Sequence, residues 1–176
     1  MNSPLPSPAA LQRKLPITDP RLRILVTING AREREAFRNY DEDDFAWLIE
    51  QGYLVAFDIS VHQRLLAVKD SSSRRELRIF PDSLNHYAHS QGNPKCGRSP
   101  YFSTWDRLIL ERHHEANIST PRASVILNCG PTHIINLIDA RLLQSVTNYG
   151  RGPKGVAQIT RDSFLTFLKS RLEGAC

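Results

Sequence analysis

The sequence predicts a mainly α-helical protein with small β-hairpins, organised as two tandem units. Apolar residues recur at helical spacing in several short segments, and breaks that contain glycine and proline separate these segments. The chain also matches itself over two blocks, which indicates an internal repeat. With 176 residues, of which 40% are hydrophobic, the chain can bury one ordinary core or two small ones.

The internal repeat has two offsets. At an offset of 89 residues, the apolar residues of 45–54 match those of 134–143. At an offset of 80 residues, the pattern I-x-x-D-S-[LF]-x-x-[YF] begins at Ile79 and again at Ile159. The first copy therefore carries nine more residues between its matched blocks. Such an insertion belongs in a loop, and three serines at 71–73 mark where we expect it, as a wing.

Two breaks divide the chain. Five prolines fall within residues 1–20, where they disfavour helix and sheet, so we expect a flexible arm there. Glycine and proline cluster again at 90–100 without apolar periodicity. The predicted division is an arm (1–20), a first unit (21–90), a linker with a connecting helix (91–118) and a second unit (119–176).

The connecting helix is predicted over residues 103–116, with Ser103 or Thr104 as its N-cap. Its residues at helical spacing are Trp105, Leu108, Ile109 and Arg112. This helix could pack on either unit or pair with a second copy of itself.

The second unit opens with a predicted helix, because Ser-Thr-Pro at 119–121 offers a capping hydroxyl followed by proline in the first turn. Residues 125–127 supply its apolar face. Asn128 can take the left-handed conformation that ends a helix, and Cys129 is expected to be a small buried side chain. Gly130 and the following proline then start another helix.

That next helix is predicted over residues 130–139. Its apolar stripe consists of Ile134, Leu137 and Ile138. The opposite face, with Ile135 at its edge, consists of small hydrogen-bonding side chains: Thr132, His133 and Asn136.

Two short strands are predicted at 142–147 and 155–159, joined by a glycine-rich turn that holds Arg151 and Lys154. A last helix opens at Arg161, and its apolar residues can close the core: Phe164, Phe167, Leu168 and Leu172. The predicted order of the second unit is helix, turn, helix, hairpin, helix.

Residues 123–138, ASVILNCGPTHIINLI, are similar without gaps to the helix-turn-helix of the MerR/excisionase family. Residues 159–168 resemble that family's wing strand and closing helix. The resemblance, together with the repeat, implies tandem winged helix-turn-helix units, of which the first is degenerate. The family usually has glycine at the position of Asn128 and serine or threonine at that of Gly130. Asn128 preserves the turn geometry, whereas Gly130 caps more weakly.

The resemblance implies that the 130–139 helix lies in the major groove of double-stranded DNA, while the wing reaches phosphate or the minor groove. Contacts to base edges are implied for Thr132, His133 and Asn136. Contacts to phosphates are implied for Arg122, Arg151 and Lys154. Asparagine can pair with adenine through two hydrogen bonds, and threonine offers a hydroxyl and a methyl group.

The first unit is not expected to read DNA, because four carboxylates at 41–44 stand at the start of its corresponding helix, although they also suit a helix N-terminus. Residues 30–90 carry 8 cations and 11 anions, whereas residues 120–173 carry 7 cations and 3 anions. We therefore expect a partner or dimerisation surface formed by Asp41, Asp43, Asp44 and Trp47. An alternative is that cations of the longer first wing still hold phosphate: Lys69, Arg74, Arg75 and Arg78.

Other functional classes lack a signal. No nucleophile-base pair, P-loop or dinucleotide fingerprint occurs, so neither enzyme activity nor a cofactor is expected. The histidine pair at 113–114 lies between two glutamates on a predicted charged helix face, without metal-site spacing, so no metal is expected. Three widely spaced cysteines and the lack of an apolar run near ~20 residues predict no membrane span and a cytoplasmic, nucleoid-associated protein.

The sequence thus predicts a DNA-binding protein, either a transcriptional regulator or a recombination directionality factor. We expect a homo-oligomer, because one winged helix usually binds too weakly to be specific alone. The alternative is a protein-interaction adaptor that keeps the winged-helix fold for docking through the acidic helix and Trp47.

Overall fold

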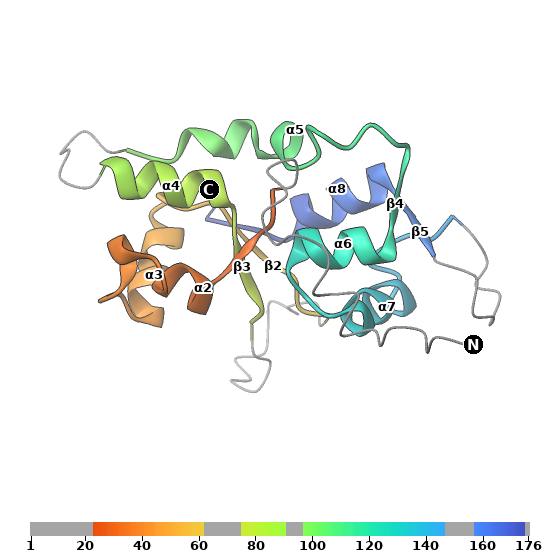
Figure 1. Ribbon diagram of the computed structural model, residues 1–176, viewed down its shortest axis with the longest axis horizontal. Helices are drawn as coiled ribbons and strands as arrows, with labels where there is room; N and C mark the ends of the chain where they lie inside the picture. The colour runs from red at the N-terminus through yellow and green to blue at the C-terminus, as the bar shows by residue number, and fades with distance from the viewer. Residues whose placement is uncertain (1–22, 62–74, 91–96, 147–156, 175–176) are drawn as a thin grey trace, which may run out of the picture.

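The computed structural model describes residues 23–61, 75–90, 97–146 and 157–174. Within these residues the protein is a mixed α/β structure with seven α-helices and two small antiparallel sheets. Figure 1 shows the two halves of the chain side by side along the longest axis, with strands β2 and β3 between them. The predicted combination of helices with small antiparallel β-structure is confirmed.

The first half, residues 23–90, alternates short strands with helices. In chain order its elements are β1 (Val26–Thr27), α2 (Ile28–Arg32), the 3-10 turn η1 (Glu35–Phe37), α3 (Glu42–Glu50), β2 (Ala56–Asp58), β3 (Leu77–Ile79) and α4 (Pro81–Ser90). Strand β3 pairs antiparallel with both β1 and β2.

The second half, residues 97–174, has a similar order after a short lead-in. Its elements are the 3-10 turn η2 (Pro100–Ser103), α5 (Trp105–Ile109), β4 (Asn117–Ser119), α6 (Thr120–Leu127), α7 (Pro131–Asp139), β5 (Gln158–Thr160), α8 (Arg161–Ser170) and β6 (Leu172–Glu173). Strand β4 pairs antiparallel with β5, as β1 pairs with β3 in the first half.

The helix boundaries of the second half follow the capping residues that the sequence offers. Ser119 is the N-cap of α6, and its hydroxyl accepts a hydrogen bond from the Arg122 amide. Asn128 ends α6 with φ 50° and ψ 53°, a left-handed conformation. Gly130 precedes α7 as an N-cap without a side-chain hydrogen bond. The predicted turn between α6 and α7 is confirmed.

The hydrogen bonds that end α3 recur after α7 at an offset of 89 residues. In each half two successive amides donate to one carbonyl of the helix: Tyr53 and Leu54 to Leu48, and Leu142 and Leu143 to Leu137. In each half the residue two positions after the helix has a positive φ, which is 74° at Gly52 and 59° at Arg141. The matched sequence blocks therefore build the same backbone turn.

A serine hydrogen bond also recurs at an offset of 80 residues. The Ser83 hydroxyl near the start of α4 accepts a hydrogen bond from the Val55 amide at 3.1 Å. The Ser163 hydroxyl near the start of α8 accepts one from the Gln144 amide at 2.7 Å. The serine of the repeated pattern thus joins the start of each helix to the segment that follows α3 or α7.

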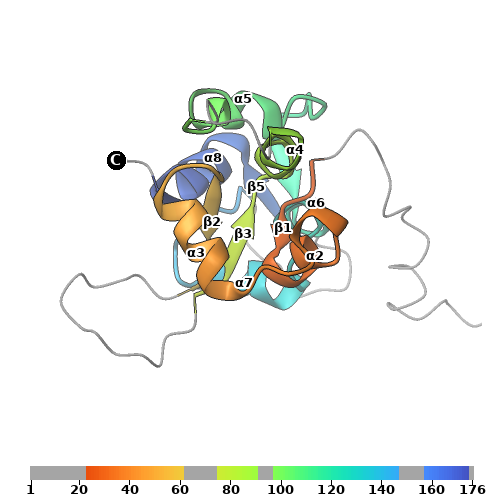
Figure 2. The same cartoon turned by 90° about the vertical axis from the view of Figure 1, so that its left-hand side faces the viewer.

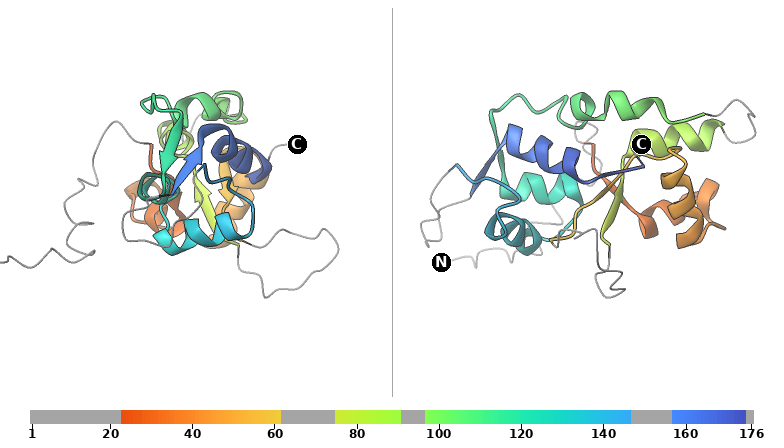
Figure 3. Two further views of the ribbon diagram at one scale, coloured as in Figure 1. Left: turned by 90° about the vertical axis from the view of Figure 1, so that its right-hand side faces the viewer. Right: turned by 180° about the vertical axis from the view of Figure 1, so that it is seen from behind.

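The two halves are joined through one sheet. Its strand order is β1-β3-β2-β6, so the last described strand of the chain pairs with β2 of the first half. Gly174 follows β6 with φ 71°, and a Cβ added there would lie 2.1 Å from the Ile49 carbonyl oxygen. This strand was not expected, because Leu172 was predicted to lie in the closing helix. Figure 3 shows β6 crossing from α8 towards the first half.

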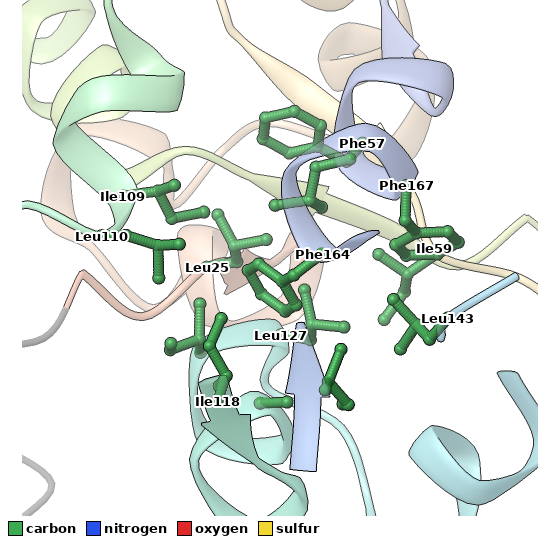
Figure 4. Close-up of a cluster of buried hydrophobic side chains, with 14 of the residues drawn as sticks. Leu25, Phe57, Ile59, Ile109, Leu110, Ile118, Leu127, Leu143, Phe164 and Phe167 are labelled. Atoms are coloured by element: carbon green, nitrogen blue, oxygen red, sulfur yellow. The ribbon is translucent and has the colours of Figure 1, made fainter. Parts of the chain in front are cut away.

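One apolar core runs through both halves. Buried residues of the first half and of the second half belong to the same cluster. Those labelled in Figure 4 are Leu25, Phe57, Ile59, Ile109, Leu110, Ile118, Leu127, Leu143, Phe164 and Phe167. The rings of Phe57 and Trp105 meet edge to face, with centroids 4.9 Å apart. A second cluster lies within the first half around Phe37 and Phe45. The halves are therefore packed as one body.

The predicted connecting helix over 103–116 is wrong in its length. Helix α5 ends at Ile109, and Trp105 and Ile109 are buried in the shared core instead of pairing with a second copy. The strand predicted at 142–147 is present only in part. Leu142 and Leu143 lie in the turn after α7. Ser145 forms an antiparallel β-bridge to Ile159, and backbone hydrogen bonds run from Val146 to Gln158 and from Thr160 to Gln144. The predicted arm at 1–20 lies outside the described residues.

Candidate nucleic-acid interface

Helix α7 is held by one face and exposed on the other. Ile134 and Leu137 on the inner face are completely buried. Thr132 and Asn136 are exposed on the outer face, and Ile135 beside them is 40% exposed. This division follows from the 3.6-residue period of the helix, which separates the apolar stripe from the polar residues. Figure 3 shows α7 along the outer edge of the second half.

The short connection between α6 and α7 is fixed by internal hydrogen bonds. The Cys129 amide donates to the Ser124 carbonyl, and the Ser124 hydroxyl donates to the Cys129 carbonyl. Burial raises the pKa of the Cys129 thiol to about 11, so this side chain stays neutral at physiological pH. Ser124 and Cys129 therefore contribute to the turn as neutral side chains.

His133 does not lie on the outer face, where the sequence placed it. Its side chain is only 14% exposed, and its Nε2 lies 2.7 Å from the Ile59 carbonyl oxygen. Because a carbonyl only accepts, this nitrogen donates. A Glu76 carboxylate oxygen lies 3.8 Å from the same nitrogen. His133 is thus bound to the first half, and the expectation that it faces outward with Thr132 and Asn136 is wrong.

The side chain of Arg78, on strand β3, also forms hydrogen bonds within the protein. Its Nε donates to the carbonyls of Leu127 and Asn128, at 3.0 and 3.2 Å, which are the last carbonyls of α6. Burial lowers the pKa of its guanidinium group, which is 13% exposed as a side chain. Arg78 is therefore engaged within the protein and does not stand free on a wing. Arg75 is exposed, and Lys69 and Arg74 lie outside the described residues.

Of the three residues predicted to contact phosphates, the structure describes one. Arg122 lies on α6 and is half-buried, and its Nε is enclosed without a hydrogen-bond partner among the described residues. Arg151 and Lys154 lie outside the described residues.

Arg141 is a cation beside α7 that the sequence analysis did not select. It is exposed, and it follows the last residue of α7 by two positions. Its positive φ of 59° matches that of Gly52 in the first half. The internal repeat indicates that Arg141 lies at the end of α7. At an offset of 89 residues it aligns with Gly52, and glycine commonly ends a helix.

The acidic residues of the first half cap α3. The Asp41 carboxylate accepts a hydrogen bond from the Asp44 amide, and the Asp44 carboxylate accepts one from the Asp41 amide, both at 2.9 Å. This reciprocal pair is a capping box, which explains two of the carboxylates structurally. Asp43 is exposed, and the Trp47 side chain is 53% exposed. Trp47 is therefore a surface residue.

The histidine segment after α5 differs from the predicted charged helix face. His113 is 3% exposed, and its Nε2 lies 2.9 Å from the Asn117 carbonyl oxygen. Among the described residues no group of three or more His, Cys, Asp or Glu side chains is arranged to hold a metal ion. No helix in the described part of the chain has the length and apolar character to cross a membrane.

Comparisons with protein-family models, with curated proteins and with solved structures found no match to this chain. Function is therefore inferred from the geometry of the described residues.

Proposed function

We propose that the protein binds double-stranded DNA through the exposed face of α7. The observation that carries this proposal is the division of α7 into a fully buried apolar face and an exposed face that presents Thr132 and Asn136. A helix that is anchored by one side and follows a short turn can be placed in the major groove as a rigid unit. In this proposal the second half is a winged helix-turn-helix, and the first half is a degenerate copy of it.

The exposed side chains suit the edges of bases and the DNA backbone. The Asn136 amide can both donate to and accept from adenine, and Thr132 can contact a base through its hydroxyl or its methyl group. Arg141 at the end of α7 would neutralise a phosphate. His133 has no part in this contact, because its ring nitrogen is bonded to Ile59.

The charge distribution supports the same half of the chain. The surplus of cations lies in residues 120–173, whereas residues 30–90 carry more anions than cations. DNA would therefore be attracted to the second half and repelled by α3. As a DNA-binding protein the chain would act as a transcriptional regulator or a recombination directionality factor. Specific binding would then need a homo-oligomer or several sites on the DNA.

Fluorescence anisotropy of labelled duplexes tests the proposal. The purified protein is titrated into random duplex and into duplex from the flanks of its own gene, over a series of salt concentrations. Tight binding to the flanking DNA that weakens as salt increases is expected. Asn136→Ala should weaken that binding about 10- to 100-fold and leave random duplex unaffected. Arg141→Gln should lower the slope of log affinity against log salt by about 1.

Two exposed residues of the first half provide matched controls. Asn39→Ala and Arg38→Gln make the same changes away from α7 and should bind DNA as the wild type does. If the wild type binds neither duplex at low salt and micromolar protein, DNA binding is excluded as the function. If it binds but both α7 variants bind equally well, the contact lies elsewhere on the protein.

A further inference from the structure

Helix α3 has an exposed face that takes no part in the proposed contact with DNA. Asp43, Trp47 and Glu50 stand at i, i+4 and i+7 and therefore share one side of the helix. All three are exposed, and we call them the α3 face. Figure 2 shows α3 at the end of the first half that faces the viewer, away from the second half.

The repeat places the α3 face at the same positions as the proposed DNA-reading face of α7. At an offset of 89 residues, Asp43, Trp47 and Glu50 correspond to Thr132, Asn136 and Asp139. The two helices have matching bounds, Glu42–Glu50 and Pro131–Asp139, and both bury the opposite side. Both faces are exposed because the opposite side of each helix is buried. The α3 face differs from that of α7 in being acidic and aromatic.

Trp47 is held in place by other rings. Its ring centroid lies 5.6 Å from that of Tyr53, which lies 5.8 Å from that of Tyr87. Tyr87 in turn stacks on the buried ring of Phe37, at 5.9 Å. This row of rings runs from the surface into the apolar cluster of the first half. A large aromatic side chain that is fixed yet 53% exposed is typical of an interaction surface.

The chemistry of the α3 face selects its partner. The flat face of an indole ring attracts a guanidinium or ammonium group, and carboxylates on either side add opposite charge. Nucleic acid is repelled by the same carboxylates. We propose that the α3 face binds an arginine- or lysine-rich segment of a partner protein.

A second copy of this chain fits the α3 face less well. Except for Arg75, its exposed described arginines stand singly in the sequence, and several have a carboxylate as chain neighbour, as Arg32 has Glu33, Arg107 has Asp106 and Arg112 has Glu111. Arg141 is exposed, but the proposed DNA contact uses it. The partner is therefore a different, basic chain, and this surface does not depend on whether α7 binds DNA.

Binding of a labelled peptide tests the proposal. The probe is a fluorescein-labelled peptide of alternating arginine and glycine, with a glutamate-glycine peptide as the matched probe, at about 0.15 M salt. The full-length protein should bind the arginine peptide and not the glutamate peptide. Trp47→Ala should weaken binding about tenfold, and Asp43→Asn with Glu50→Gln should weaken it several-fold and reduce its salt dependence.

The repeat provides controls of the same type at matched positions. Asn136→Ala and Asp139→Asn change the corresponding residues of α7 and should leave peptide binding unchanged. Circular dichroism should show the wild-type helix content in every variant, with a lower melting temperature only in Trp47→Ala, which loses the contact with Tyr53.

Three outcomes would overturn the proposal. The first is no binding of the arginine peptide at micromolar protein. The second is equal weakening by the α3 and α7 substitutions, which would mean that binding follows net charge alone. The third, seen by sedimentation velocity, is self-association of the wild type that Trp47→Ala abolishes, because the occupant of the α3 face would then be a second copy.

Discussion

Arg78 shows at the scale of one residue how the first half supports the second. Its guanidinium group lies where α6 ends and donates to two carbonyls that the helix itself cannot satisfy. The sequence suggested a free wing cation at this position. A charged donor beside the turn holds α6, and with it the start of α7, against strand β3.

We expect Arg78→Ala to lower the free energy of unfolding by about 2 kcal/mol, because two carbonyls at the end of α6, one of them part-buried, lose a charged donor. Urea denaturation followed by circular dichroism measures the change. Arg75→Ala, an exposed arginine three residues earlier, should change stability by less than about 0.5 kcal/mol. Equal effects of the two substitutions would show that Arg78 contributes no specific contact.

Cys129 gives a prediction about pH. Burial raises the pKa of its thiol to about 11 from an ordinary value of 9.0. Between pH 9 and pH 11 the unfolded chain loses this proton while the folded protein keeps it, so stability decreases as pH rises through this window. Because the side chain is only partly buried, we expect a loss of about 1 kcal/mol.

Comparison with Cys129→Ala isolates this contribution from other groups that titrate at high pH. Urea denaturation of both proteins at pH 8 and at pH 11 should show a larger decrease for the wild type. Parallel decreases in the two proteins would mean that the Cys129 thiol ionises alike in the folded and unfolded chains.

At the scale of the element, α4 and α8 begin with the same type of serine hydrogen bond, but the two serines differ in exposure. Ser83 is completely buried, and Ser163 is half-buried. Removal of the Ser83 hydroxyl leaves the Val55 amide without its acceptor inside the protein, whereas water can reach the exposed Gln144. The cost of losing the hydroxyl should therefore differ between the halves.

We expect Ser83→Ala to destabilise the protein by about 2 kcal/mol and Ser163→Ala by about 1 kcal/mol or less. Thermal and urea unfolding of the two single variants measure the difference. A Ser163→Ala variant that is less stable than Ser83→Ala would contradict this explanation.

The elements themselves were predicted where their signals are local. Helices α6, α7 and α8 begin and end close to the expected residues, because proline, asparagine and capping hydroxyls act on neighbouring backbone groups. Helix α5 was predicted too long. The apolar spacing of 105–109 came from burial in the shared core, and the charged residues after Leu110 do not continue the helix.

At the scale of the whole molecule, the shared core makes the two halves interdependent. Strand β6 completes the sheet of the first half, and Phe57 packs on Trp105 of the second. The sequence suggested two units with a linker, but the larger cluster takes buried residues from both halves, and only the cluster around Phe37 and Phe45 lies within one half. Both surfaces proposed here, on α3 and on α7, therefore belong to one rigid body, and Figure 1 shows these helices towards opposite ends of it.

We expect the protein to unfold in a single cooperative transition. Circular dichroism, which reports on all helices, and tryptophan fluorescence, which reports on Trp47 and Trp105, should give the same midpoint in urea. Two separate transitions, or midpoints that differ between the two probes, would mean that the halves are stable independently of each other.

The sequence by itself determined the features that depend on neighbouring residues. These are the turn at Asn128, the buried stripe of α7 and the repeated start of α4 and α8. Each of them follows from caps, backbone conformations and apolar periods that act over a few positions. For the candidate site, this was enough to place Thr132 and Asn136 on an exposed face.

Only the tertiary structure decided which polar side chains stay free. His133 bonds to a carbonyl 74 residues away, and Arg78 to one 49 residues away. The pairing of β6 with β2 likewise joins the end of the second half to the first. No local pattern encodes such contacts, because they depend on how distant segments pack. This packing engages His133 and Arg78 within the protein and brings residues of both halves into one core.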